Sequence, residues 1–133
     1  MTKENLVHHS LEESPIPLFK AFKCAFDGVV HAITTQRNFK IHLIAALFAV
    51  AIAIYFQVSP IEFAIVILCI FSVFACELIN TAIESVIDLV SPEWNELAKH
   101  AKDCAAGAVL LISIMSVIIA AFIFIPRMFN LWT

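Results

Sequence analysis

The feature that most constrains this chain is an apolar run from Ala105 to Ile125, in which only Ser113 and Ser116 have polar side-chain atoms. A helix needs about 20 residues to cross the hydrocarbon core of a bilayer, so this run is long enough to span one. Hydrophobic residues make up 62% of the chain and charged residues 14%. This composition predicts an all-α polytopic membrane protein, and it excludes a disordered chain or an ordinary cytosolic domain.

Two further apolar runs precede this one and predict two more membrane spans. The first covers about residues 39–58. The second begins at Ile61 and continues as one helix to Val90, where Ser91 and Pro92 end it. Such a helix would be roughly 45 Å long against a core of about 30 Å, so its end is expected to project into the cytosol. The third span is expected over residues 103–125, and its helix opens at Glu96.

The basic residues predict the orientation, because cytoplasmic loops of membrane proteins are enriched in lysine and arginine. Seven of the eight basic residues lie before the first span or between the second and third spans (Lys3, Lys20, Lys23, Arg37, Lys40, Lys99 and Lys102), and only Arg127 follows the third. We therefore expect the N-terminus in the cytosol and the C-terminus outside.

An amphipathic helix is predicted over residues 18–35, ahead of the first span. Its apolar residues recur at helical spacing, and its lysines fall on the opposite face, which is typical of a helix lying in a membrane surface. It could serve as an anchor alone, or its polar face could also cover a site. Residues 1–17 form a polar tail that we expect to be cytosolic, and residues 18–133 form a single membrane domain.

A stripe of polar side chains marks the cytosolic half of the second helix. Its members share one helix face by their spacing: Glu77, Asn80, Thr81, Glu84 and Asp88. Carboxylates beside lipid are costly and need cations, protons or a metal ion. Mg²⁺ suits one or two carboxylates that also meet substrate phosphates. The alternative is a stripe that only solvates the helix end, which is more plausible for Asp88 than for Glu77.

Opposite charge lies close by in the sequence. Lys102 and Asp103 are expected where the third helix meets the cytosol, and Lys102 could either bind a phosphate or simply anchor the membrane boundary. A third polar cluster, residues 36–40, precedes the first span at the same depth. Phosphoryl transfer mainly needs a metal ion, a cation and a base for the acceptor hydroxyl, and the three clusters together contain these parts.

These motifs carry a resemblance to a known family. The segment from Glu77 to Glu84, then Asp88, then Ala101-Lys102-Asp103 followed by Ala105 to Leu110 after Cys104, closely resembles the small bacterial membrane lipid kinases, the prokaryotic diacylglycerol kinase and undecaprenol kinase family. The likeness covers about residues 18–126. It implies a homotrimer of three-span subunits in the bacterial cell membrane, with active sites shared between subunits at the cytosolic leaflet. No nucleic-acid partner is expected.

The resemblance also implies roles for individual residues. Glu77 would be the catalytic base that binds the acceptor lipid, with Asn80 beside it. Glu84 would bind the Mg²⁺ that carries ATP, and Asp88, Lys102 and Asp103 would belong to the ATP site. Where well-studied members have a second metal-binding glutamate, this chain has Gln36, whose amide oxygen can bind Mg²⁺ but adds no charge.

The acceptor and one rival function remain open at this point. The stretch from Gln36 to His42 and the run from Ala105 to Leu110 look more like Gram-positive undecaprenol kinases than enterobacterial diacylglycerol kinases. Undecaprenol is therefore the expected acceptor, with diacylglycerol as the alternative. A small oligomeric ion channel or carrier would also suit an acidic stripe, but the first and third spans have no matching polar stripe to line a pore.

Overall fold

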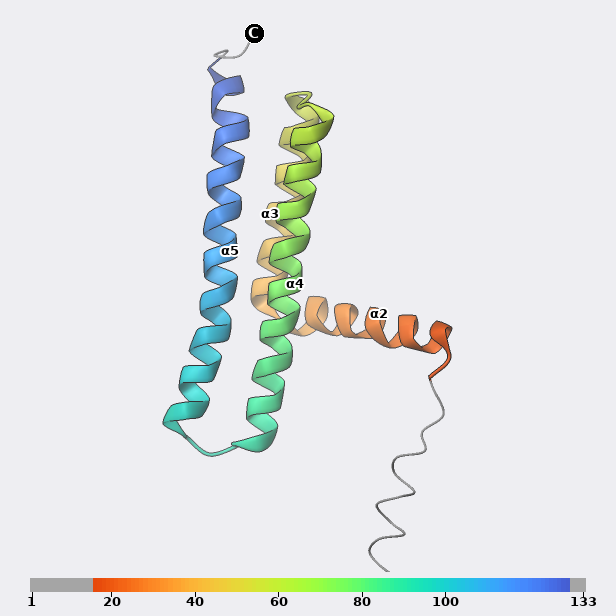
Figure 1. The fold of residues 1–133 in the computed structure, drawn as a ribbon, viewed down its shortest axis with the longest axis vertical. Coiled ribbons are helices and arrows are strands. Elements are labelled where there is room, and N and C mark those ends of the chain that lie inside the picture. Colours follow the sequence, from red (N-terminus) through yellow and green to blue (C-terminus); the bar gives the residue numbers. More distant parts are fainter. Residues whose placement is uncertain (1–15, 130–133) are drawn as a thin grey trace, which may run out of the picture. The chain divides into compact units, whose positions relative to one another are not determined.

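The computed structural model describes residues 16–129, and in this range the chain is entirely helical (Figure 1). The helices are α2 (Leu18–Thr35), α3 (Arg37–Tyr55), α4 (Pro60–Val90) and α5 (Glu96–Met128). This confirms the predicted all-α class with three membrane-length helices. Most of the polar tail predicted over residues 1–17 lies outside the described residues.

Helix α2 belongs largely to a compact unit of its own, residues 1–31, and residues 32–133 form the second unit. Pro17 precedes the helix, and its carbonyl accepts the backbone N–H groups of Lys20 and Ala21 in the first turn. The apolar residues of the helix include Phe19, Phe22 and Phe26, all of which are exposed. This pattern agrees with the predicted amphipathic helix, whose location in a membrane surface stays a prediction.

Both ends of α4 are fixed by local sequence. Ser59 and Glu62 form a capping box, in which the Ser59 hydroxyl accepts the Glu62 backbone N–H at 3.3 Å and the Ser59 N–H donates to Glu62 Oε2 at 2.8 Å. Pro60 occupies the first turn, where its missing N–H costs nothing. At the other end, Ser91 precedes Pro92, which disfavours helical geometry and ends the helix.

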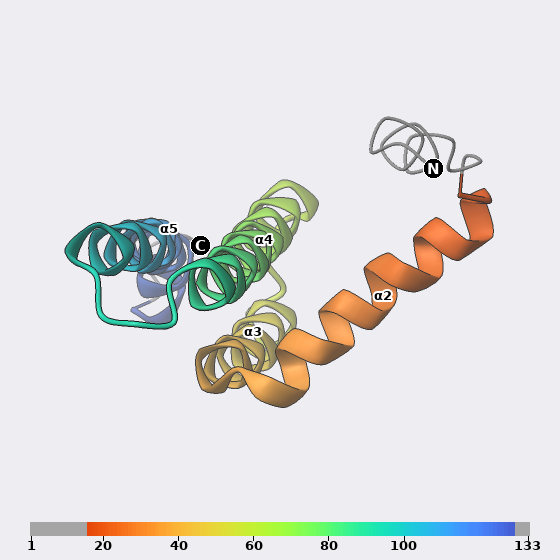
Figure 2. The same ribbon diagram turned by 90° about the horizontal axis from the view of Figure 1, so that it is seen from below.

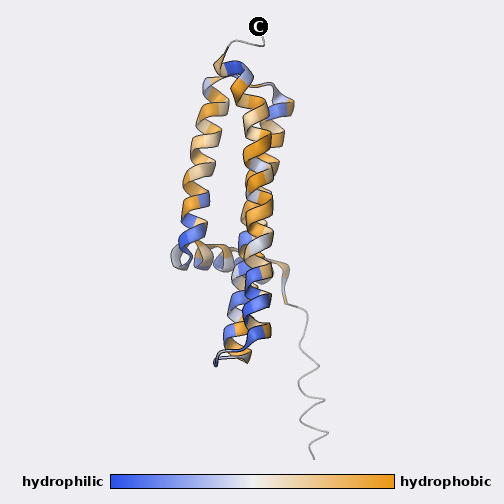
Figure 3. Ribbon diagram, turned by 90° about the vertical axis from the view of Figure 1, so that its left-hand side faces the viewer, coloured by the Kyte–Doolittle hydropathy of each residue, from blue (hydrophilic) through white to orange (hydrophobic). Residues whose placement is uncertain are grey.

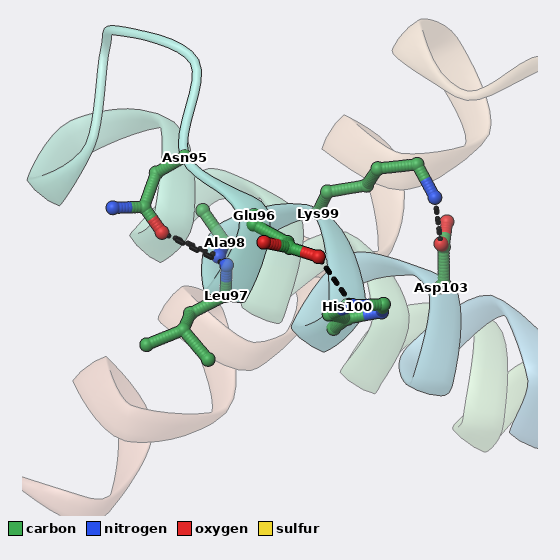
Figure 4. Close-up of polar contacts among 7 residues, drawn as sticks. All are labelled: Asn95, Glu96, Leu97, Ala98, Lys99, His100 and Asp103. Atoms are coloured by element: carbon green, nitrogen blue, oxygen red, sulfur yellow. Dashed lines mark hydrogen bonds and ion pairs between the residues drawn. The ribbon is translucent and has the colours of Figure 1, made fainter.

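Helix α5 begins at Glu96, as predicted, and continues to Met128, three residues past the span expected over residues 103–125. Asn95 caps it: its Oδ1 accepts the backbone N–H groups of Leu97 at 2.9 Å and Ala98 at 3.2 Å (Figure 4). The helix continues past Pro126 near its other end, where Arg127 Nη1 donates to the Ile123 carbonyl at 2.9 Å.

Helix α4 lies between α3 and α5, and it packs against both more extensively than they pack against each other (Figure 2). At the end that holds the α3–α4 turn, one buried cluster joins the three helices through Ala53, Val66, Ile123 and Phe124. Towards the other end, the rings of Phe39 and Phe74 stack with centroids 5.1 Å apart. Together these contacts set the antiparallel register of α4 against both neighbours.

All three helices are long and apolar enough to cross a membrane. Their middle parts are hydrophobic, and polar residues gather at the end that holds the α4–α5 turn (Figure 3). Most of their large apolar side chains, such as Leu47, Leu68 and Phe122, are exposed in the single chain. Lipid or other subunits must therefore cover these faces.

Candidate active site

The most unusual polar residue of the bundle is Glu77 on α4, whose side chain is only 2% exposed. It follows Val66 by eleven residues and Val73 by four, so it continues the buried apolar face of the helix. Its Oε2 atom has no hydrogen-bond partner among the described residues. Burying an unpartnered carboxylate oxygen is costly, and such atoms in native structures call for an explanation through function or an absent ligand.

Asn80, three residues after Glu77 on α4, is 5% exposed and contacts Glu84, the next carboxylate of the stripe. Its amide Nδ2 donates to Glu84 Oε1 at 3.1 Å, and its own Oδ1 is buried without a partner in the described part of the chain. The amide therefore orients the Glu84 carboxylate while its own oxygen stays available. This hydrogen bond follows from the i, i+4 spacing of the two residues, a signal present in the sequence.

The residues predicted for the nucleotide site on α4 and α5, Asp88, Lys102 and Asp103, lie near the α4–α5 turn. Lys102 Nζ donates to Asp88 Oδ1, which joins α5 to α4, and Lys99 Nζ donates to Asp103 Oδ2 at 2.7 Å within α5 (Figure 4). A pocket of about 300 Å³ opens here, lined by both ion pairs and by the turn residues Glu93 and Trp94. Sequence reasoning assigned Asp88 and Lys102 to one nucleotide site without predicting that they bind each other.

Gln36 lies at the N-terminal end of α3 and is half-buried. It is the N-cap residue of this helix, but its side chain makes no capping hydrogen bond. It precedes Phe39 by three residues, and Glu77 follows Phe74 by three, so the Phe39–Phe74 stack between antiparallel helices puts Gln36 level with Glu77. The polar cluster of residues 36–40, at the start of α3, and the polar stripe on α4 therefore lie at one depth.

The predicted residues do not all gather at one point of a single chain. Asp88 is eleven residues from Glu77 on α4, a separation of about 16 Å along the helix. Among the residues the structure describes, no three His, Cys, Asp or Glu side chains lie close enough together to hold a metal ion. Oxygen donors for Mg²⁺ are nevertheless present in Glu84 and in the unpartnered oxygens of Glu77 and Asn80, and Mg²⁺ commonly takes only one or two carboxylates beside substrate phosphates.

Two structurally important residues were missed by sequence reasoning. Arg127 was noted only as a single basic residue after the third span, but it binds Glu62 at 2.7 Å. Ser113 was noted only as a polar atom in the third span, but its hydroxyl is buried and has no hydrogen-bond partner within residues 16–129. The signal for both was their spacing from other polar residues across two antiparallel helices, which becomes visible only when the register is known.

Three membrane-length helices, one of which holds a buried carboxylate, with ion pairs between α4 and α5 at both ends, define an integral-membrane protein with an enzyme-like polar site. Residues 23–124 match the family model described as prokaryotic diacylglycerol kinase. The chain therefore belongs to the prokaryotic diacylglycerol kinase family, as its motifs predicted.

The names of similar proteins are consistent with membership of this family. The chain is 43% identical over 115 residues to a diacylglycerol kinase of Synechocystis. The matched region covers 86% of this chain and 66% of the relative, slightly less than two thirds of the relative's length. It is 41% identical over 110 residues to the undecaprenol kinase of Bacillus subtilis, covering 83% of this chain and 89% of the relative. It is 34% identical over 101 residues to the diacylglycerol kinase of Escherichia coli K12, covering 76% and 83%. The family and these names indicate a phosphotransferase with an alcohol acceptor in a bacterial membrane.

Proposed function

We propose that this protein is an ATP- and Mg²⁺-dependent lipid kinase that transfers the γ-phosphate to the hydroxyl of a membrane lipid alcohol. The observation that carries the proposal is a buried carboxylate oxygen of Glu77, on a membrane-length helix, that has no hydrogen-bond partner among the residues the structure describes. A base at this position can meet a hydroxyl presented from the bilayer. Family membership supports the same class of reaction.

Each predicted site residue has its own role in the proposed reaction. Glu77 accepts the proton of the acceptor hydroxyl, and Asn80 holds Glu84 through its amide. Glu84 would bind Mg²⁺, with Gln36 as a neutral second ligand. Bound Mg²⁺ would neutralise phosphate charge during transfer. Lys102 and Asp103, with Asp88, form the nucleotide site next to the pocket at the α4–α5 turn.

A homotrimer with shared sites is part of the proposal. The exposed apolar faces of α3, α4 and α5 provide surface for subunit contacts as well as for lipid. Glu77 and the cations around Lys102 are separated along one chain, which favours a site completed by a neighbouring subunit. Cross-linking of purified protein in detergent should yield a trimer as its largest species.

We place the active site at the cytosolic leaflet of a bacterial cell membrane, with the N-terminus in the cytosol. The support is the seven-to-one distribution of basic residues, which puts the α4–α5 turn inside. This is also the side on which ATP is available. The turn between α3 and α4 would then face outwards.

Undecaprenol is the acceptor we favour, and diacylglycerol is the alternative. The support is the Gram-positive likeness of residues 36–42 and 105–110, together with similarity to a named undecaprenol kinase over most of its length. A relative named diacylglycerol kinase is at least as similar, which is why diacylglycerol is the alternative. The two acceptor lipids differ next to the hydroxyl: diacylglycerol has two ester carbonyls that can accept hydrogen bonds from the protein, whereas a polyprenol has no such carbonyl.

The test is a competition assay with Mg-ATP and both lipids at equal mole fraction in one mixed micelle. We expect a higher kcat/KM for undecaprenol. A preference for diacylglycerol of about tenfold, or about 1.4 kcal/mol in transition-state binding, would overturn the acceptor but not the kinase. Absence of any lipid-dependent ATP turnover would overturn the kinase and favour a channel or carrier.

A further inference from the structure

The pairing of α4 with α5 is fixed at both ends by ion pairs. Glu62 binds Arg127 at one end, and Asp88 binds Lys102 at the other. Two straight antiparallel helices held in this way must keep the same register in between. Glu77 follows Glu62 by fifteen residues and Ser113 precedes Arg127 by fourteen, so the two residues lie at nearly the same level.

Glu77 and Ser113 lie not only at the same depth but also on facing sides of α4 and α5. Eleven residues make three turns plus about 20°, so residues eleven apart lie on nearly the same face, roughly 16 Å apart. On α4, Glu77 lies eleven residues from both Val66 and Asp88. On α5, Ser113 lies eleven residues from both Phe124 and Lys102. Asp88 binds Lys102, and Val66 shares a buried cluster with Phe124, so Glu77 and Ser113 form the facing pair between them.

The hydroxyl of Ser113 differs from the other serine hydroxyls within these two helices. Ser72, Ser85 and Ser116 each donate to the backbone carbonyl four residues earlier, at 2.7 to 2.8 Å, as serines in helices commonly do. Ser113 does not make this bond. Its Oγ is buried and has no partner in the described part of the chain, and the same holds for Glu77 Oε2.

We propose that Ser113 binds the hydroxyl group of the acceptor lipid together with Glu77, an inference that rests on the proposed kinase function. A carboxylate can only accept a hydrogen bond, whereas a serine hydroxyl can also donate one. An alcohol matches both, because its O–H donates to Glu77 while its oxygen accepts from the Ser113 O–H. Ser113 thereby holds the acceptor oxygen at the base from the opposite helix.

The chemical step remains balanced with this contact. The second lone pair of the acceptor oxygen forms the bond to the γ-phosphorus, and the bond from that phosphorus to the bridging oxygen of ADP breaks. The acceptor proton moves to the Glu77 carboxylate, and ADP leaves with the electron pair of the broken bond. Ser113 takes no proton, so its contribution is to binding and orientation.

The first test compares Ser113→Ala with Ser116→Ala, which removes only a bond to the helix backbone. One ordinary hydrogen bond corresponds to a change of about fivefold to tenfold in affinity. We expect Ser113→Ala to raise the KM for undecaprenol or 1,2-dioctanoylglycerol by about that factor. The kcat and the KM for Mg-ATP should stay near wild type, because the lost contact is made equally in ground and transition states. Ser116→Ala should change none of these values.

A second measurement uses unreactive inhibitors and does not depend on comparing turnover. The methyl ether of the acceptor keeps an oxygen that accepts from Ser113, whereas the deoxy analogue has none. We expect wild type to bind the ether about fivefold more tightly than the deoxy analogue, and Ser113→Ala to bind them equally. An unchanged lipid KM in Ser113→Ala, or an ether preference that persists in this variant, would overturn the role of Ser113 alone. A wild-type protein that phosphorylates neither lipid would overturn the proposed function as well.

Discussion

The guanidinium of Arg127 lies 2.7 Å from the carboxylate of Glu62 and joins the last turn of α5 to the first turn of α4. The same carboxylate oxygen accepts the backbone N–H of Ser59, so one side chain both caps a helix and receives an ion pair. The two side chains are 23% and 27% exposed, which leaves less screening by water than at an open surface.

Arg127→Met should therefore destabilise the protein by about 2 kcal/mol, because it leaves the Glu62 charge partly buried without its partner. Denaturation of detergent-solubilised protein measures the loss. Lys99→Met is the matched control: it also removes an ion pair, but both side chains of that pair are 58% exposed and screened by water, so we expect a clearly smaller loss. Equal losses of stability in the two variants would show that the partly buried ion pair stabilises the protein no more than the exposed one.

Glu77→Gln should lower kcat by more than about a hundredfold, the usual size of a general-base contribution, with little change in the KM for ATP. Steady-state kinetics with saturating lipid measure both values. Glu96→Gln is the control, since the Glu96 side chain is 76% exposed on α5 and its change should leave kcat near wild type. If Glu77→Gln keeps near wild-type turnover, Glu77 is not the base.

Glu84→Gln should raise the Mg²⁺ concentration needed for half-maximal activity, because it removes an anionic ligand. Asn80→Ala should act in the same direction by about tenfold, since the amide that orients Glu84 is lost. Mg²⁺ titrations at fixed total ATP, corrected for Mg-ATP, give the values. Unchanged titrations in both variants would remove Glu84 from the metal site.

Gln36→Glu should tighten apparent Mg²⁺ affinity, because it adds an anionic oxygen at the level of Glu77. The same titration measures the effect. Asn38→Glu, an exposed position two residues further along α3, controls for the added negative charge. The assignment of Gln36 to the metal site fails if the two variants titrate alike.

Membrane-impermeant thiol labelling tests the orientation. In a background without Cys24, Cys69, Cys76 and Cys104, a cysteine at Ser59 should react from outside the cell. A cysteine at Glu93 should react only after the membrane is opened. The opposite pattern would overturn both the topology and the cytosolic location of the nucleotide site.

Much of the fold could be predicted from the sequence, because long apolar runs have few alternatives in a bilayer. The start of α4 beside Ser59 and Pro60 and its end before Pro92 follow from local backbone chemistry. The start of α5 at Glu96 was also predictable, since Asn95 is a favourable cap. The first span was harder to delimit than the third, because its apolar run reaches membrane length only with its polar flanks.

The candidate site was only partly predictable. The stripe containing Glu77, Asn80 and Glu84 follows from periodicity along one helix. The pairing of Glu62 with Arg127 spans 65 residues and depends on the register of two helices, which no local pattern contains. The position of Ser113 opposite α4 depends on the same register, so it could not be predicted from a local pattern either. The catalytic and metal-binding roles are predictions that the variants of Glu77, Glu84 and Gln36 test.

The burial of Glu77 has a consequence for fidelity. A kinase that bound water at its base as readily as an alcohol would consume ATP without phosphorylating lipid. Because the Glu77 side chain is only 2% exposed within its own chain, bulk solvent has little access to it. A lipid tail, in contrast, can lie along the exposed apolar faces of the helices and bring its head to the same depth. Selection against futile hydrolysis would then be achieved by the route of approach, before any contact with the reacting hydroxyl is made.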